Sequence, residues 1–219
     1  FGGVYTLKNL HKIFCGSQKV KIYLVSEKNY FLFTPLLHEV ATGAINPENI
    51  VEPIRKVLGC CLDKFYLGKV KKISLSEKSV EVGDCKISYD YLVLAPGAET
   101  NFYNIPGAEK YSFPLKTIEH AVKIKNQVIL KLEKALHAKD ETERKRRLSF
   151  VVVGGGATGV EFVAELEEFI KETLDYYYPP LIIQNLSITL IQKDIELIPS
   201  FHPHLRKKSL RVMNKKGIT

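Results

Sequence analysis

The glycine-rich segment VVVGGGATGVE at residues 151–161 limits the possible folds of this chain more than any other feature. Its first three residues belong to a continuous apolar run at 148–153, which predicts a buried strand. The glycines that follow precede a helix predicted to reach about Tyr178. A second strand is predicted at 186–192. This order of strand, glycine turn, helix and strand is the context that a dinucleotide-binding βαβ unit requires. The weaker alternative is a tight strand–helix turn without a ligand.

Each glycine of the motif has its own expected role. Gly154 permits the tight turn, Gly156 lets the backbone approach a pyrophosphate, and Gly159 lets the helix and strand pack closely. The N–H groups and partial positive charge at the helix N-terminus would bind the phosphates. We therefore predict that the whole turn contacts a cofactor through Gly154, Gly155, Gly156, Ala157, Thr158 and Gly159.

The residue at the end of the second strand bears on which nicotinamide binds. An acid commonly stands there and binds the ribose hydroxyls of NAD, but this strand ends at Gln192. A neutral amide can hydrogen-bond the ribose without repelling a 2′-phosphate. NADH is therefore the expected nucleotide and NADPH stays an alternative, because Lys193 and Asp194 can shift the preference in either direction.

The start of the chain resembles the end of a second unit of the same kind. Phe1-Gly2-Gly3 precede an amphipathic helix predicted at 4–14 and a strand predicted at 20–25. In this register Gly3 takes the place of the third glycine, and Glu27 is the expected acceptor of the ribose 2′-hydroxyl. The alternative is a surface glutamate that happens to follow a strand. Each half of the chain thus has the layout of a parallel α/β sheet, with the charged run at 139–147 as a linker.

Between these units the pattern changes. Residues 29–45 predict loop and short helix, and residues 46–48 and 53–58 predict short helical pieces. Short strands with turns are predicted between 65 and 89, followed by a buried strand at 91–95. That strand ends in Pro96-Gly97, where the absence of a side chain on Gly97 lets the backbone lie close to a ligand. A long amphipathic helix is predicted at 117–138.

Composition excludes several classes of protein. With 45% hydrophobic and 26% charged residues the chain is typical of a globular protein, and we predict neither a membrane-spanning run nor a secretory signal. The net charge of +8 is interpreted as a solvated basic surface, whose densest run is 144–147, and not as a nucleic-acid site.

The four cysteines are Cys15, Cys60, Cys61 and Cys85, and none forms a C-x-x-C motif. The vicinal pair Cys60-Cys61 cannot form an easy bridge. We therefore predict no metal site and no catalytic dithiol, and thiols that stay idle in a reducing compartment.

Three segments together resemble a known family: NYFLFTPLLHEVATG at 29–43, YDYLVLAPGAETNFYNIPGAE at 89–109 and FVVVGGGATGVEFVAEL at 150–166. In this order and spacing they resemble type II NADH dehydrogenase, the single-chain, non-proton-pumping NADH:quinone oxidoreductase of the two-dinucleotide flavoprotein superfamily. The stretch TPLLHEVATG is more specific to that family than the glycine motifs, which the whole superfamily shares.

The resemblance implies two Rossmann-like domains, an FAD-binding domain at 1–116 and an NAD(P)H-binding domain at 117–219 inserted into it. Both are expected to be incomplete, because the first strand of the FAD site and everything after Thr219 would lie outside this chain. The FAD contacts that it implies are Phe1, Gly2, Gly3, Glu27, Thr34, Pro35, Val70, Ala95 and Gly97.

Two carboxylates follow the second glycine turn at the spacing of one helical turn, so that they share a face. The resemblance implies that Glu165 points toward the contact between nicotinamide and flavin as a catalytic residue, and that Glu161 belongs to the cofactor site. For each, the alternative is a partly exposed helix carboxylate.

The function that the resemblance implies is hydride transfer from NADH to FAD, followed by delivery of electrons to a quinone in a respiratory chain. It also implies a peripheral position on the cytoplasmic side of a membrane, reached through amphipathic helices beyond Thr219, and allows a homodimer. Rival functions are those of a sulfide:quinone oxidoreductase, a pyridine-nucleotide disulfide reductase or a non-catalytic nucleotide-binding protein. The lack of a paired-cysteine motif after the first helix argues against the disulfide reductases.

Overall fold

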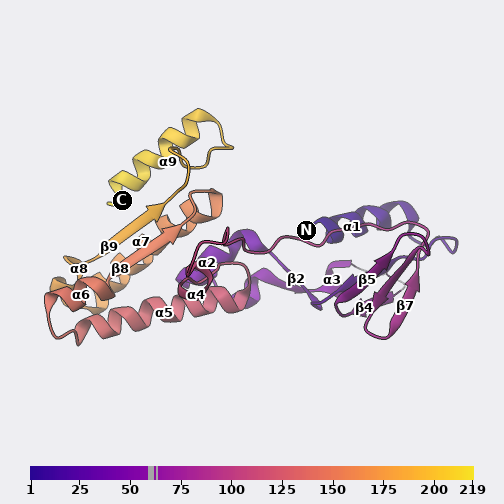
Figure 1. The fold of residues 1–219 in the computed structure, drawn as a ribbon, viewed down its shortest axis with the longest axis horizontal. Coiled ribbons are helices and arrows are strands. Elements are labelled where there is room, and N and C mark those ends of the chain that lie inside the picture. The colour runs from indigo at the N-terminus through magenta and orange to yellow at the C-terminus, as the bar shows by residue number, and fades with distance from the viewer. Residues whose placement is uncertain (59–61, 63) are drawn as a thin grey trace. The chain divides into compact units, whose positions relative to one another are not determined.

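The computed structural model describes residues 1–58, 62 and 64–219 (Figure 1). The chain forms two compact units, each built from two stretches of sequence. Unit 1 comprises Phe1–Phe33 and Ile50–Glu99, and unit 2 comprises Thr34–Asn49 and Thr100–Thr219. The predicted division after residue 116 concerns which nucleotide each domain binds, and it stays a prediction. Cys60 and Cys61 lie outside the described residues.

Unit 1 combines helices with a parallel strand pair, an antiparallel strand pair and a three-stranded antiparallel sheet. β1 runs parallel to β4 with Tyr23 opposite Lys64, and β2 runs antiparallel to β3. Its elements in chain order are α1 (Gly2–Phe14), β1 (Tyr23–Ser26), β2 (Tyr30–Leu32), β3 (Val51–Pro53), α3 (Ile54–Leu58), β4 (Lys64–Leu67), β5 (Val70–Ser74), β6 (Ser79–Val82) and β7 (Cys85–Ser88).

The predicted amphipathic helix at the start of the chain is confirmed, and it begins at Gly2. It buries Val4 and Leu7, which are one helical turn apart, against Ile54 of α3. Partly buried side chains complete this cluster, namely Ile22, Leu24, Phe31, Val57, Leu62 and Phe65. The helix is therefore held over the β1–β4 pair by the apolar face that its sequence predicted.

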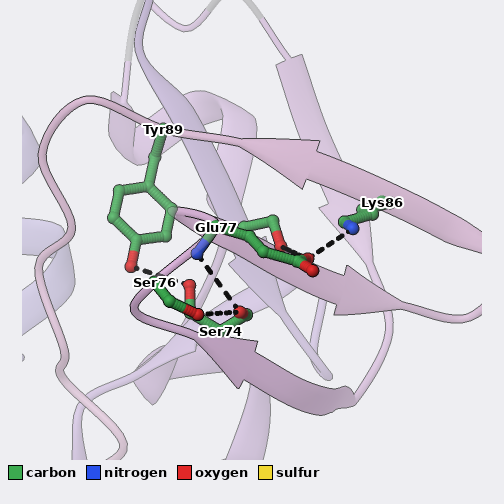
Figure 2. A network of polar contacts seen from close by, with 6 residues as sticks. Ser74, Ser76, Glu77, Lys86 and Tyr89 are labelled. Carbon is green, nitrogen blue, oxygen red and sulfur yellow. Dashed lines mark hydrogen bonds and ion pairs between the residues drawn. The ribbon is translucent and has the colours of Figure 1, made fainter.

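The short strands with turns predicted between 65 and 89 are also confirmed, and three of them form the antiparallel meander β5–β6–β7. Figure 2 shows the polar network at the turn between β5 and β6, where the Glu77 amide donates to the Ser74 hydroxyl at 3.4 Å. Lys86 Nζ on β7 lies 2.6 Å from Glu77 Oε2, and the Tyr89 hydroxyl donates to the Ser74 carbonyl at 3.5 Å. These contacts join the turn between β5 and β6 to β7 and to Tyr89.

Unit 2 is a parallel strand pair covered by helices. β8 and β9 pair in register from Ser149 opposite Ser187 to Val153 opposite Ile191. Its elements are η1 (Thr34–Leu36), α2 (Leu37–Thr42), α4 (Ala108–Tyr111), α5 (Ile118–Leu136), α6 (Glu141–Arg147), β8 (Ser149–Val153), α7 (Ala157–Tyr177), α8 (Pro180–Ile183), β9 (Ser187–Ile191) and α9 (Pro203–Lys215), and the short η2 (Pro47–Ile50) leads from this unit back to unit 1.

The last residue extends this sheet. The Leu190 amide donates to the Thr219 carbonyl at 2.7 Å, and the Thr219 amide donates to the Ile188 carbonyl at 3.1 Å. These are the bonds that a parallel neighbour makes with β9. The unit therefore continues the alternation of strand and helix past β9, in agreement with the predicted α/β layout.

The core of unit 2 lies between its helices. α2 packs against both α5 and α7, and its residues Val40 and Ala41 are completely buried. α5 contributes buried residues at helical spacing, Ala121, Ile124, Val128, Leu132 and Ala135, and α7 contributes Phe162, Val163, Leu166, Ile170 and Leu174. The stretch 34–49, which lies between two parts of unit 1 in the sequence, thus belongs to the core of unit 2.

The predicted linker at 139–147 is wrong, because residues 141–147 form the helix α6. Its start is capped in a way that resembles a capping box: the Glu143 amide donates to the Asp140 side chain at 2.7 Å, and the amide of Lys139, the residue before the N-cap, donates to the Glu143 side chain at 3.1 Å. An ion pair of 3.0 Å between Arg147 and Glu143 adds support one turn apart. Capping and ion pairing thus stabilise α6, although this helix has no apolar face to bury.

The buried strand predicted at 91–95 is wrong as well. These residues form no strand in the described part of the chain, and Tyr91, Val93 and Leu94 are exposed. An apolar segment forms a strand only where another strand pairs with it. No strand among the described residues pairs with 91–95. The strand predicted at 148–153 forms as β8, but it is only half covered, since Val151 and Val153 are exposed.

Candidate functional site

The glycine turn between β8 and α7 has the geometry that the motif predicted. Gly154 has φ of +112°, a conformation that side chains disfavour, and its amide donates to the Ile191 carbonyl at 2.8 Å. A Cβ placed on Gly159 would lie 1.8 Å from the carbonyl oxygen of Gly154. Any side chain at position 159 would therefore push the helix away from the turn.

The second glycine of the motif faces open space. A Cβ on Gly156 would meet no atom of the described residues within 4 Å, and its φ of −73° suits any residue. Gly156 begins α7 without a capping side chain among the described residues, and the first turn of the helix carries no acid. The N-terminal N–H groups of Ala157, Thr158 and Gly159 are thus placed to receive an anion, as a pyrophosphate requires.

Gln192 contacts the turn directly, which the sequence did not reveal. Its Oε1 accepts a hydrogen bond of 2.8 Å from the Gly155 amide, and its Nε2 donates to Asp194 Oδ2 at 3.1 Å. A Cβ on Gly155 would lie 3.0 Å from the Cβ of Gln192. Gln192, which is predicted to bind the ribose, therefore also bonds to the backbone of the glycine turn.

The loop after β9 also bonds to the glycine turn. The Ile198 amide donates to the Gly155 carbonyl at 2.7 Å, and Ile198 has φ of +43°. Arg206 of α9 forms an ion pair with Glu196 of this loop. Both polar groups of the Gly155 backbone are thus bonded within unit 2, one by Gln192 and the other by Ile198.

The two carboxylates of α7 that share a face lie in different surroundings. Glu161 is exposed, whereas the side chain of Glu165 is 24% exposed and its Oε2 lies 3.5 Å from Nε2 of His38. Burial raises the pKa of Glu165 above its ordinary value, against the opposing influence of His38. The nearby carboxylates of Glu39, Glu168 and Glu161 raise this pKa further.

His38 is the site residue that the sequence analysis did not single out. It lies on α2 between the buried residues Leu37 and Val40, and its side chain is 14% exposed. Thr34 and Pro35, which were predicted to contact FAD, begin η1 just before it in the same unit. A histidine beside the buried residues of a short helix was the available clue, but only the fold brings it to Glu165.

In unit 1 the predicted cofactor residues gather at the start of α1. A Cβ on Gly2 or Gly3 would lie 3.4 or 3.7 Å from the Cβ of Ala95, so the segment around Ala95 passes beside the helix start. The ring of Phe1 packs against Phe31 with 5.1 Å between centroids. No side chain of the described residues caps this helix.

Two other predicted residues of unit 1, Glu27 and Val70, follow the carboxyl ends of its parallel strands β1 and β4. Glu27 is exposed directly after β1, and Val70 begins β5 after the turn in which the Gly68 amide donates to the Ser26 carbonyl. Gly97 has φ of +79°. A helix N-terminus with glycines, and an acid after the next parallel strand, fit the phosphates and the ribose of a dinucleotide.

Other kinds of site find no support in the described part of the chain. No group of three or more His, Cys, Asp or Glu side chains there is arranged to hold a metal ion. Cys15 directly follows α1, Cys85 begins β7, and both are exposed. No helix among the described residues is both long and apolar enough to cross a bilayer.

Comparisons with known proteins agree with this geometry. The sequence model of the family described as pyridine nucleotide-disulphide oxidoreductase matches residues 1–219. The chain is 36% identical over 231 residues to the mitochondrial external alternative NAD(P)H-ubiquinone oxidoreductase B2 of Arabidopsis thaliana, over 100% of this chain and 39% of that protein. It superposes on the structure of NDH2 from Plasmodium falciparum in complex with NADH with a TM-score of 0.84 and 32% identity.

The structural match covers 92% of this chain and 43% of the Plasmodium protein, so the chain spans less than half the length of these relatives. The sulfide:quinone oxidoreductase of Aquifex aeolicus also superposes, with a TM-score of 0.76 over 99% of this chain and 47% of that one. Its identity of 24% makes this a likeness of fold alone.

Proposed function

The chain belongs to the pyridine nucleotide-disulphide oxidoreductase family, and on this premise we propose that it serves electron transfer from NADH to a quinone through bound FAD. The homology to type II NADH dehydrogenases, predicted from three sequence segments, is confirmed, at about 36% identity to an NAD(P)H-ubiquinone oxidoreductase. The observation that carries the proposal is the turn in which Gly159 lies against the Gly154 carbonyl and Gly156 faces open space.

We propose that this turn holds the pyrophosphate of NADH. The backbone N–H groups of Ala157, Thr158 and Gly159 and the positive end of α7 supply the attraction, and Gly156 leaves room for close approach. The relative from Plasmodium falciparum, solved with NADH, supports this assignment. Gln192 keeps the turn in shape through the Gly155 amide, and its neutral side chain tolerates NADPH as the alternative nucleotide.

We propose that unit 1 binds the phosphates and the ribose of FAD. Phe1, Gly2 and Gly3 would bind its phosphates at the start of α1, and Glu27 would accept its ribose hydroxyl. The remaining residues assigned to it by family resemblance are Thr34, Pro35, Val70, Ala95 and Gly97. When bound, FAD supplies the chemistry that accepts a hydride and passes two electrons on.

Glu165 is the proposed catalytic residue. Its partial burial and raised pKa distinguish it from Glu161, which is exposed and is assigned to the outer part of the nucleotide site. Perturbed carboxyls in a cofactor region are candidates for proton transfer. We propose that Glu165 orients the nicotinamide and holds a proton there.

The quinone and the membrane are further parts of the proposal. The Arabidopsis relative is named as a mitochondrial, external NAD(P)H-ubiquinone oxidoreductase, which supports a quinone as the electron acceptor. We propose a peripheral position at a membrane surface on the cytoplasmic side, where a quinone is within reach. A homodimer is compatible with this position.

Flavin absorbance tests the proposed function directly. The purified chain is mixed with FAD, and its absorbance near ~450 nm is followed while NADH is added without oxygen. Bleaching by NADH, and recovery of the colour on adding a soluble quinone, are the expected results. Binding of NADH by a chain that takes up no flavin would instead support a non-catalytic nucleotide-binding protein, and would contradict the proposal.

A further inference from the structure

The contact between His38 and Glu165 joins two segments that are far apart in the sequence. His38 lies on α2, Glu165 lies on α7, and the two helices pack against each other within unit 2. Nε2 of the imidazole is 3.5 Å from Oε2 of the carboxyl, and the side chains are 14% and 24% exposed. The imidazole of His38 thus contacts a carboxyl on α7, the helix that follows the glycine turn.

The carboxyl oxygen in this contact has no other partner. Glu165 Oε2 is buried, and it makes no hydrogen bond among the described residues. A buried carboxylate without hydrogen bonds is costly, and it is relieved by taking up a proton or by a cation beside it. Either a positive charge on the neighbouring His38 or a proton on Glu165 itself would therefore lower the cost of burying this carboxyl.

The charged groups around Glu165 make His38 the decisive neighbour. Glu161 and Glu168 approach it along α7, and Glu39 approaches it from α2. On α5, which packs against α2, Lys125 lies beside Gly43 at the end of α2. Among the described side chains that influence Glu165, His38 favours its ionised form, while the three carboxylates oppose it.

The geometry points to His38 as the positioning residue that sets the protonation state of Glu165, with the pair sharing one proton between the imidazole and the carboxyl. The catalytic consequence rests on the proposed function. In that reaction NADH, a quinone and one proton from solvent become NAD⁺ and a hydroquinone, so a proton must be taken up in each turnover. The pair holds this proton on Glu165, and His38 tunes its release.

A purely structural role for His38 is the rival interpretation. The imidazole would then fill space between α2 and α7 without affecting the titration of Glu165. The two interpretations differ in a quantity that packing does not change, the pKa of the Glu165 carboxyl.

Carbon NMR of the purified chain measures that quantity without any cofactor. Glutamate is labelled with ¹³C at the side-chain carboxyl, and Glu165→Gln identifies the Glu165 resonance by its loss. In His38→Gln, which keeps a polar group near the position of Nε2, the pKa of Glu165 should rise above its wild-type value because the imidazole that lowers this pKa is gone. Glu39→Gln is the matched control, and it should lower the same pKa because it removes a carboxylate.

Equal titration of Glu165 in wild type and His38→Gln, with Glu39→Gln shifted downward, would overturn the proposal. Circular dichroism checks that each variant is folded, and His38→Asn replaces His38→Gln if the latter unfolds. In that case an unchanged pKa of Glu165 in His38→Asn is the contradicting result.

The pH profile of the reoxidation of NADH-reduced flavin by a soluble quinone provides the second measurement. If Glu165 donates the proton that the quinone takes up, reoxidation slows as the pH rises through the pKa of Glu165, and this decline should move to higher pH in His38→Gln and to lower pH in Glu39→Gln. A profile that stays in place in both variants would contradict the catalytic consequence. A chain that shows no bleaching at all would refute the proposed function, while the NMR titration would still decide the pairing.

Discussion

The glycine turns at the starts of α7 and α1 are fixed by different contacts. At the start of α7, Gly159 lies so close to the Gly154 carbonyl that a Cβ would come within 1.8 Å of it, and Gln192 and Ile198 bond the Gly155 backbone. At the start of α1, a Cβ on Gly3 would lie 3.7 Å from Ala95, an ordinary contact. The turn before α7 is fixed by the close approach of Gly159 to Gly154 and by the bonds from Gln192 and Ile198, whereas the start of α1 has an ordinary contact with the segment around Ala95.

The largest difference between the two turns should appear with alanine substitutions. Gly159→Ala forces a backbone shift that should cost about 3 kcal/mol of unfolding free energy and remove NADH binding. Gly3→Ala should stay within about 1 kcal/mol of wild type, since helix propensity favours alanine. Urea unfolding and NADH titration measure both effects, and equal losses in the two variants would break the comparison.

The ion pairs of the two units should differ as well. In unit 2, Lys216 Nζ lies 2.9 Å from Glu167 Oε2, and Glu167 is 5% exposed; in unit 1, Lys86 and Glu77 pair on the surface. Lys216→Met should lose about 2 kcal/mol of unfolding free energy at pH 7, because it leaves a buried carboxylate short of a partner. Lys86→Met should show no measurable loss.

The loss in Lys216→Met should depend on pH. Burial pushes the pKa of Glu167 up, but hydrogen bonds from Lys171 and Lys216 outweigh it and leave the pKa below its ordinary value. A lowered folded-state pKa contributes stability that is present above the unfolded value and is lost as the pH falls through the folded value. The difference between wild type and variant should therefore shrink in acid, and a constant difference would contradict this ion pair.

The bond from Gln192 to the turn predicts a change of nucleotide preference. Gln192→Glu keeps an acceptor for the Gly155 amide but brings a negative charge to the ribose, so the ratio of NADH to NADPH affinity should rise by about tenfold. Calorimetric titration with both nucleotides measures it. Asp194→Asn serves as the control, and an unchanged ratio in Gln192→Glu would remove this residue from the site.

The smallest expected effect concerns Glu165. Burial raises its pKa in the folded chain, so the folded state holds the proton more tightly than the unfolded state. The resulting stability is present below the unfolded pKa and is lost as the pH rises through the folded pKa. Glu165→Gln should therefore be slightly more stable than wild type at pH 8 and equal to it in acid. Urea unfolding at both pH values tests this sign, and a less stable variant at pH 8 would contradict it.

The sequence predicted the features that rest on local pattern. The roles of Gly154 and Gly159, the helices α1, α5 and α7, and the meander follow from spacing that the structure confirms. Helix α6 was missed because its charges were interpreted as a solvated linker, although Asp140 and Glu143 stand at capping-box spacing.

Features that depend on tertiary packing could not be predicted from the sequence. The segment 91–95 has strand composition, but no described strand pairs with it. The contact of His38 with Glu165 and the bond from Gln192 to Gly155 each join residues that only the fold brings together. The polar residues of a site are the part least constrained by hydrophobic periodicity.

Binding of NADH to wild type and Gly156→Ala tests most directly the claim that the turn of unit 2 is the nucleotide site. Position 156 has an ordinary φ, and an added Cβ meets no described atom within 4 Å, so the variant should melt at the wild-type temperature. Its methyl group would occupy the space of the pyrophosphate, and calorimetry should show affinity for NADH weakened by at least about tenfold. Equal affinity in the two proteins would place the nucleotide elsewhere and contradict the account.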